Sequence, residues 1–183
     1  MRMKKVLVGL LIFFAATAQA QFSKASLQAS GLTCSMCSKA VKTALEQVSF
    51  VDKVQVDIKN QQYNLTFNAN EEVDIDALAK AVQDAGFSVA SLKVTVALNN
   101  LTLQKDHHTK IGGHNFHFLN STGQQVNGDV TFSVVDKAFV SAREFRKYAS
   151  MTKMACVRSG RMAKCCTKEA ASAGEERIFH VII

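Results

Sequence analysis

The stretch that decides the fold is Gly31-Leu32-Thr33-Cys34-Ser35-Met36-Cys37, because two different periodicities meet there. Before it, Ala25, Leu27 and Ala29 alternate with polar residues, which predicts a short half-buried strand. After it, apolar residues recur at helical spacing, at Ala40, Val41, Ala44, Leu45 and Val48. The stretch is therefore a loop between a strand and a helix, and it carries two cysteines separated by two residues.

The residues that follow repeat the alternation of strand and helix. Strands are predicted at 54–58, 63–67 and 92–98 from their alternating apolar residues. Asp74 can cap a second helix, and Gly86 suits its C-terminal end. The order strand, helix, strand, strand, helix, strand predicts an α+β, ferredoxin-like βαββαβ domain with both helices on one face of the sheet. In this topology, the cysteine loop lies beside Gly86 and Phe87.

The two cysteines suggest a site for a soft metal ion. Cys37 lies at the start of the helix, where unpaired N–H groups and the helix dipole favour a thiolate. Cys34 and Cys37 together suit Cu(I), Ag(I) or Hg(II), whereas a closed structural Zn(II) site needs four ligands. The alternative is a thiol-disulfide oxidoreductase in which Cys34 is the nucleophile and Cys37 the resolving thiol. The chain contains no proline and its element order differs from thioredoxin, so metal binding is favoured.

The cysteine loop, followed about fifty residues later by Asp84-Ala85-Gly86-Phe87, closely resembles the heavy-metal-associated domain. This family includes copper chaperones, metal-binding domains of copper-exporting ATPases and periplasmic mercury-binding proteins. The resemblance covers residues 21–98 and implies that Cys34 and Cys37 hold the metal and pass it on, without enzymatic activity. The partner would be a metal-transporting membrane protein or another metal carrier.

Three neighbours of the cysteines bear on the choice of metal within this resemblance. Leu32 stands where the family often has Met, and both residues fill a similar volume beneath the loop. Thr33 favours Cu(I) over Zn(II), because zinc-binding relatives often have an acidic residue at this position. Phe87 does not distinguish copper from mercury, because an aromatic residue at this position resembles both the copper-ATPase domains and many mercury-binding relatives. Met36 could supply a third ligand, but an outward position or packing on Phe87 is favoured.

The N-terminal residues resemble a secretory signal peptide. Arg2, Lys4 and Lys5 precede an apolar run from Val6 to Ala16, and small residues then suit cleavage after Ala20. The run is shorter than the ~20 residues of a spanning helix, so cleavage is favoured over retention as an anchor. We therefore expect a signal peptide at 1–20 and a periplasmic location.

Charge divides the remaining chain in two. The net charge of +7 is distributed as +3 in residues 1–20, −1 in 21–98 and +5 in 99–183. The change near Asn99 and Asn100 predicts a second, basic, β-rich domain at 99–183, to which no family is assigned. Strands are expected near 101–103, 115–119, 130–135 and 178–183, and Ser141 can cap a short helix. No aromatic interleaving or motif indicates nucleic acid as a partner.

Two clusters of potential ligands occur in this C-terminal half. The first comprises His107, His108, His114 and His117. Their spacing matches no closed metal site, and solvated histidines are favoured over Cu(II) or Zn(II) ligands. The second comprises Met151, Met154, Cys156, Met162, Cys165 and Cys166. A disulfide from Cys156 to Cys165 or Cys166 is slightly favoured over a second Cu(I) site.

Overall fold

The computed structural model describes residues 21–183, except 70, 163–165 and 167–175. The predicted signal peptide at 1–20 lies outside the described residues. None of the helices in the described part of the chain has the length and apolar character of a membrane span.

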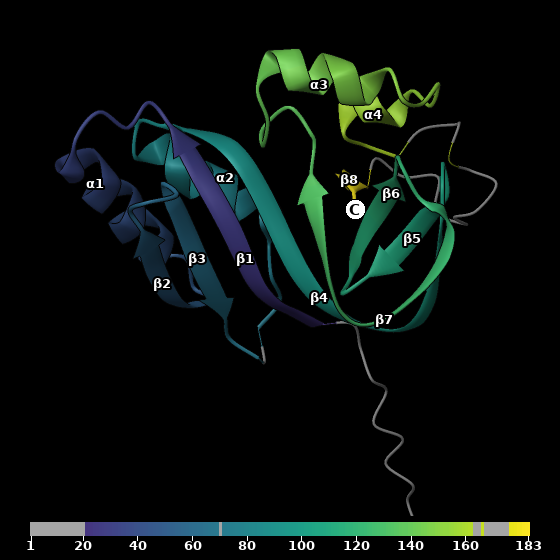
Figure 1. Ribbon diagram of the computed structural model, residues 1–183, viewed down its shortest axis with the longest axis horizontal. Helices are drawn as coiled ribbons and strands as arrows, with labels where there is room; N and C mark the ends of the chain where they lie inside the picture. The colour runs from purple at the N-terminus through teal and green to yellow at the C-terminus, as the bar shows by residue number, and fades with distance from the viewer. Residues whose placement is uncertain (1–20, 70, 163–165, 167–175) are drawn as a thin grey trace, which may run out of the picture.

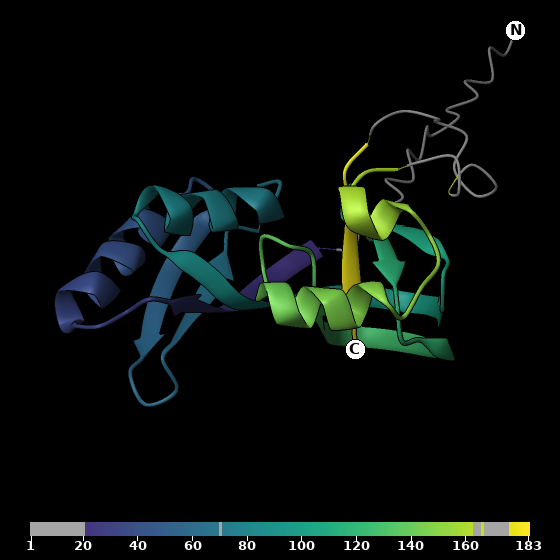
Figure 2. The same ribbon diagram turned by 90° about the horizontal axis from the view of Figure 1, so that it is seen from above.

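The N-terminal half has the predicted order of elements. These are β1 (Gln21–Ser30), α1 (Ser35–Glu46), β2 (Val51–Asp57), β3 (Gln62–Phe67), α2 (Ile75–Asp84) and β4 (Ser88–Gln104). The strands run in the order β2-β3-β1-β4, all antiparallel to their neighbours. Both helices cover the same face of this sheet (Figure 2). The α+β architecture and the βαββαβ order are therefore confirmed.

The C-terminal half continues the same sheet. Its elements are β5 (His108–Ile111), β6 (His114–Phe118), β7 (Thr122–Val134), α3 (Ala142–Ala149), α4 (Cys156–Ser159) and β8 (Ile178–Ile182). The eight strands follow the order β2-β3-β1-β4-β7-β8-β6-β5 (Figure 1). Ser141 caps α3 with a complete capping box to Glu144, which confirms the predicted helix.

Strand β4 crosses the expected boundary between residues 98 and 99. It pairs with β1 on one side and with β7 on the other, from Leu92↔Val134 to Gln104↔Thr122. At Asn99 and Asn100 the register shifts, and Asn100 has a φ of 46°, a left-handed conformation that Asn tolerates better than most residues. The division into domains at 21–98 and 99–183 stays a prediction, and the residues that suggested it form an irregularity within one strand.

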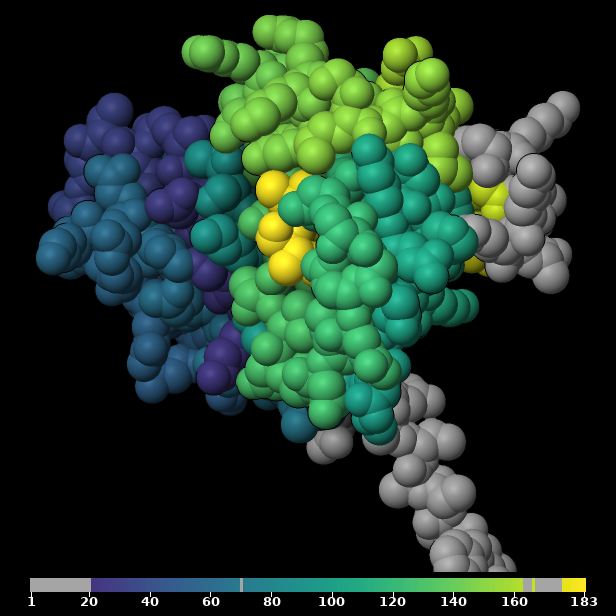
Figure 3. Space-filling model, turned by 45° about the vertical axis from the view of Figure 1, so that its right-hand side comes forward, coloured from purple at the N-terminus to yellow at the C-terminus, as the bar shows by residue number. Residues whose placement is uncertain are grey.

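A single apolar core extends under both halves. It includes Phe22 of β1, whose ring lies 5.9 Å from that of Phe116 in β6, centroid to centroid. Phe116 also packs against Phe132 of β7 and Phe179 of β8. The space-filling view accordingly shows the C-terminal part, teal to yellow, lying directly against the purple and blue N-terminal part (Figure 3).

Candidate metal centre

The cysteine loop connects β1 to α1, and the backbone of the loop fixes both cysteines. Cys34 is the N-cap of α1 with extended backbone angles (φ −154°, ψ 168°), and its Sγ accepts a hydrogen bond from the Cys37 N–H at 3.4 Å. Gly31 has a φ of 86°, which favours glycine, and a Cβ at this position would lie 3.8 Å from the Phe87 ring. The predicted proximity of the loop to Phe87 is therefore confirmed.

The two thiols lie side by side at the surface. Cys34 Sγ and Cys37 Sγ are 3.0 Å apart, and both residues carry thiols. Cys34 is exposed and Cys37 half-buried. A metal–thiolate bond is about 2.3 Å long, so two sulfurs on one ion lie at most about 4.6 Å apart. Small rotations of the side chains would bring both sulfurs onto one ion.

Hydrogen bonds favour the thiolate form of Cys37. The contact with the Cys34 thiol is the largest cause that lowers the pKa of Cys37, from 9.0 to about 7. Hydrogen bonds with the backbone and the hydroxyl of Thr33 lower the pKa further, and Thr33 Oγ1 lies 3.8 Å from Cys37 Sγ. A substantial fraction of Cys37 is therefore ionised at neutral pH, the form that binds soft metals and attacks disulfides.

The first turn of α1 is anchored to the sheet by Tyr63 of β3. The Tyr63 side chain is buried, and its hydroxyl donates to the Ser38 carbonyl at 3.2 Å and lies 3.0 Å from the Ser38 hydroxyl. Leu32 packs on the core beneath the loop, as expected, whereas Met36 points outward and is 70% exposed. Tyr63 was predicted as a strand residue, and its contact with α1 depends on a pairing of elements that local sequence does not show.

The C-terminal histidines differ from the prediction of solvated side chains. His107 is exposed, but His117 is fully buried, so that prediction is wrong for His117. His114 is half-buried and its Nε2–H donates to the Val73 carbonyl at 2.6 Å. His108 lies in β5, directly opposite His117 in β6.

The sulfur-containing residues gather in part. Cys156, Met162, Cys166 and Ile178 form a small apolar cluster, with Met154 packed against it. Cys156 and Cys166 are both thiols, so the predicted disulfide between them is wrong. Cys165, the other predicted partner, lies outside the described residues. Met151 is half-buried and is not part of this cluster.

The comparisons with known proteins agree with the geometry of the N-terminal half. The profile of the heavy-metal-associated domain matches residues 26–88. A mercuric transport protein periplasmic component from Acinetobacter calcoaceticus is 36% identical over 92 residues, which cover 50% of this chain and 99% of that protein. The chain belongs to the heavy-metal-associated domain family.

Two further matches each cover little more than a third of this chain. A copper-transporting ATPase from Helicobacter pylori is 35% identical over 65 residues, 36% of this chain, and the chain spans only 9% of that ATPase. The crystal structure of oxidized MerP from Ralstonia metallidurans CH34 is 33% identical, covers 38% of this chain and 94% of its own, and has a TM-score of 0.34. The family profile ends at residue 88 and leaves the C-terminal half unassigned.

Proposed function

We propose that Cys34 and Cys37 bind one soft metal ion, Cu(I) before Hg(II) or Ag(I), and that the chain carries this ion to a partner protein. The observation that carries the proposal is the pair of surface thiols 3.0 Å apart at the start of α1. Two ligands leave the ion open to attack by an incoming thiolate, which is what transfer requires. Zn(II) is disfavoured because this loop supplies only two of its usual four ligands.

The relatives support transport of a soft metal. One is named a mercuric transport protein and another a copper-transporting ATPase. The receiving partner is accordingly a metal-transporting membrane protein or another carrier. Cys34 lines a groove with Lys39, Lys42 and Ile58, and Ile58 is 84% exposed. An apolar side chain beside an exposed metal site suits transient contact with a protein partner.

Export to the periplasm is part of this proposal. Strand β1 begins at Gln21, directly after the predicted cleavage site at Ala20, so removal of residues 1–20 leaves the described fold complete. The Acinetobacter relative is named as a periplasmic component. Cell fractionation and N-terminal sequencing should find a mature chain in the periplasm that begins near Gln21; an unprocessed cytoplasmic chain would contradict export.

Anaerobic titration of the reduced chain with Cu(I), against a chromophoric Cu(I) chelator, tests the site. Cys34→Ser and Cys37→Ser should each remove one equivalent of tightly bound Cu(I), while the matched loop variant Ser35→Ala should keep it. For transfer, the loaded chain is mixed with the matching 65-residue region of the Helicobacter ATPase. Movement of copper to that region is the expected result, and unchanged Cu(I) stoichiometry in both cysteine variants would sink the proposal.

A second assay, reduction of insulin disulfides, separates carriage from redox catalysis. The lowered pKa of Cys37 and the exposure of the pair would also suit a thiol-disulfide oxidoreductase. Reduction of insulin disulfides by the metal-free chain, together with no Cu(I) retained at Cys34 and Cys37 against the chelator, would favour that alternative. Copper retention with little insulin reduction is expected for a carrier.

A further inference from the structure

Three histidines form a row across the last three strands of the sheet. His108 of β5 is directly opposite His117 of β6, and His117 is directly opposite His180 of β8. Directly paired residues project from the same face of a sheet. The rings follow this pattern, with centroid distances of 5.0 Å between His108 and His117 and 5.1 Å between His117 and His180.

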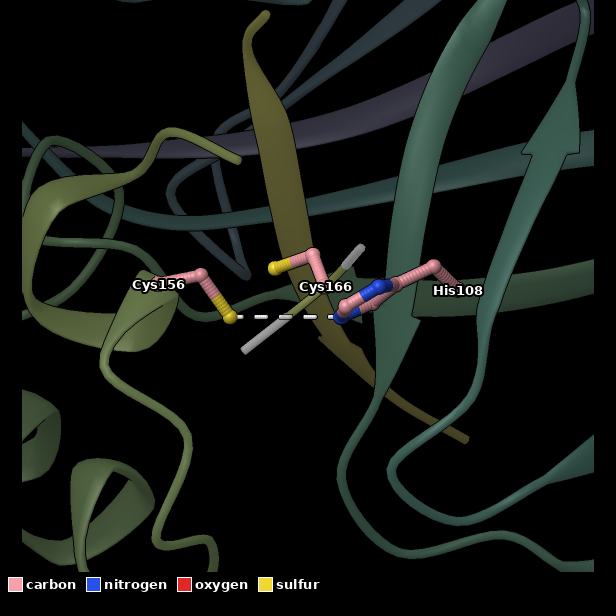
Figure 4. Close-up of side chains that lie close together, drawn as sticks. All are labelled: His108, Cys156 and Cys166. Carbon is pink, nitrogen blue, oxygen red and sulfur yellow. Dashed lines mark hydrogen bonds between the residues drawn. The ribbon is translucent and has the colours of Figure 1, made fainter. Parts of the chain in front are cut away.

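Cysteines lie over this row. Cys156 Sγ, from α4, is 3.7 Å from His117 Nδ1 and 3.9 Å from His108 Nε2. Ligand atoms of His117, Cys156 and His180 lie within 4.8 Å of one another, and those of His108, Cys156 and Cys166 do as well. Figure 4 shows the His108 imidazole reaching from β5 towards the Cys156 sulfur, to which a dashed line joins it, with Cys166 beside them. The Cys156 sulfur is therefore common to two sets of three potential ligands.

Carboxylates orient two of the imidazoles towards the thiol. His117 Nε2 lies 3.0 Å from Asp106 Oδ1, so its N–H points to Asp106 and its Nδ1 lone pair faces Cys156. His180 Nδ1 lies 2.7 Å from Asp136 Oδ1, which leaves Nε2 as the nitrogen with a lone pair. A carboxylate on the second ring nitrogen is the usual support of a histidine that binds metal.

His180 Nε2 gives an independent indication of a ligand. Its residue is fully buried, and within the described part of the chain this nitrogen has no hydrogen-bond partner. Buried polar atoms are normally paired, because an unmade hydrogen bond costs about 1–3 kcal/mol. A purely structural cluster would leave that cost uncompensated, whereas a metal ion between Nε2 and the Cys156 sulfur would remove it.

We propose that His117, His180 and Cys156 form a second metal site, separate from the Cys34–Cys37 pair, and that it takes a copper ion. Two imidazoles and one thiolate, all fully buried, form the set of two nitrogens and one sulfur that copper favours, and Met154 and Met162 border the site. Zn(II) usually takes four protein ligands in a structural site, and the fully buried set provides three. His108 and Cys166 lie beside the same sulfur.

The two sites share no residue and lie towards opposite ends of the sheet order (Figure 1). A Cys34→Ser/Cys37→Ser chain removes the first site and isolates the second. Titrated anaerobically with Cu(I) against the chelator, this double variant should still bind one ion per chain. Adding Cys156→Ala should weaken binding by at least ~10²-fold, because even loss of a supporting carboxylate costs 10–100-fold. Adding His107→Ala, which changes the exposed neighbour of His108, should leave binding unchanged.

Two measurements keep the test valid if a buried variant fails to fold. Asp106→Asn alters a side chain that is 40% exposed and should weaken Cu(I) binding ~10–100-fold without unfolding the chain. X-ray absorption of the copper-loaded double variant should show both sulfur and imidazole nitrogen around the ion. Absence of Cu(I) binding by the double variant, or copper without a sulfur neighbour, would overturn the second site. Selective retention of Zn(II) when both ions are offered would overturn the assignment to copper.

Discussion

Arg177 joins α2 to the C-terminal strands, and its replacement tests how the two parts of the sheet are held together. Its guanidinium donates through Nε and Nη2 to both carboxylate oxygens of Asp76, at 2.7 and 3.0 Å. Nη2 also lies 3.5 Å from Asp136, and Nη1 donates to the carbonyls of Gly160 and Ile178 at 3.0 and 2.6 Å. Burial alone would lower the pKa of Arg177, but the hydrogen bonds to Asp76 and the charge of Asp136 outweigh it and raise the pKa.

The loss in the free energy of unfolding on Arg177→Ala follows from these contacts. Hydrogen bonds to charged groups contribute about 1.5–3 kcal/mol each. The Asp76 side chain is 45% exposed, so solvent screening reduces the contribution of its two hydrogen bonds with Arg177. Asp136 is only 7% exposed and would lose its contact with the guanidinium. The stacking of Arg177 on the Phe179 ring, at 4.1 Å from the centroid, adds about 1 kcal/mol. We expect the free energy of unfolding to fall by about 3 kcal/mol, and the Tm by about 6–12 °C.

Urea unfolding of the metal-free chain, followed by circular dichroism, measures this loss. Arg177→Lys keeps the charge but not the paired hydrogen bonds, so about half the loss should remain. Lys80→Ala is the matched control, because the Lys80–Asp84 pair is an exposed contact within α2 and should contribute at most ~0.5 kcal/mol. A loss below about 1 kcal/mol in Arg177→Ala would refute the role of Arg177 as a link between α2 and β8.

Three further predictions concern single residues. The rate at which Cys37 is alkylated, measured by mass spectrometry, should depend on its thiolate fraction and fall as the pH drops below about 7. Cys34→Ala removes the main hydrogen bond that lowers the pKa of Cys37 and should move the midpoint of this pH dependence towards 9. Ser141→Ala removes the hydrogen bond from the Glu144 N–H to Ser141 Oγ and should cost about 1 kcal/mol in urea unfolding, with Ser141→Thr nearly neutral. Phe116→Ala, at a fully buried ring between the two halves, should cost about 3–5 kcal/mol, and Phe116→Leu much less.

Each of these predictions has a contradicting outcome. A Cys37 midpoint that stays near 9 in the unmodified chain would mean that the Cys34 contact does not favour the thiolate. A Ser141→Ala chain as stable as Ser141→Thr would show that the capping box contributes nothing measurable. A Phe116→Ala chain that loses no more stability in urea unfolding than Phe116→Leu would show that the buried ring does not join the two halves.

The N-terminal half was predictable because its signals are local. The alternation before Gly31 and the helical stripe after Cys37 each lie within about ten residues, and the cysteine loop fixes their connection. The same holds for α3, whose start follows from Ser141 and Glu144 three residues later. The change of net charge near Asn99 and Asn100 predicted a domain boundary, and it did not show that β4 continues through these residues with only a shift of register.

The row of histidines could not be predicted from local spacing. His180 is 63 positions beyond His117, and only the parallel pairing of β6 with β8 makes them neighbours. The prediction considered residues 107–117 alone and therefore never included His180. One signal was present: His117 lies between Phe116 and Phe118, and His180 between Phe179 and Val181. A continuous apolar run of this kind is typical of a strand buried on both faces, where a histidine has to be paired.

The continuous strand β4 has a consequence for the chain in solution. In a sheet that ended at β4, the side of β4 away from β1 would present unpaired N–H and C=O groups, and an exposed edge of this kind recruits strands from other molecules. Here β7 pairs with that side along most of its length, from Leu92 to Gln104. The C-terminal half thus protects the heavy-metal-associated domain from strand addition by other chains. A fragment cut after Leu98 would lose this cover and should self-associate through β4.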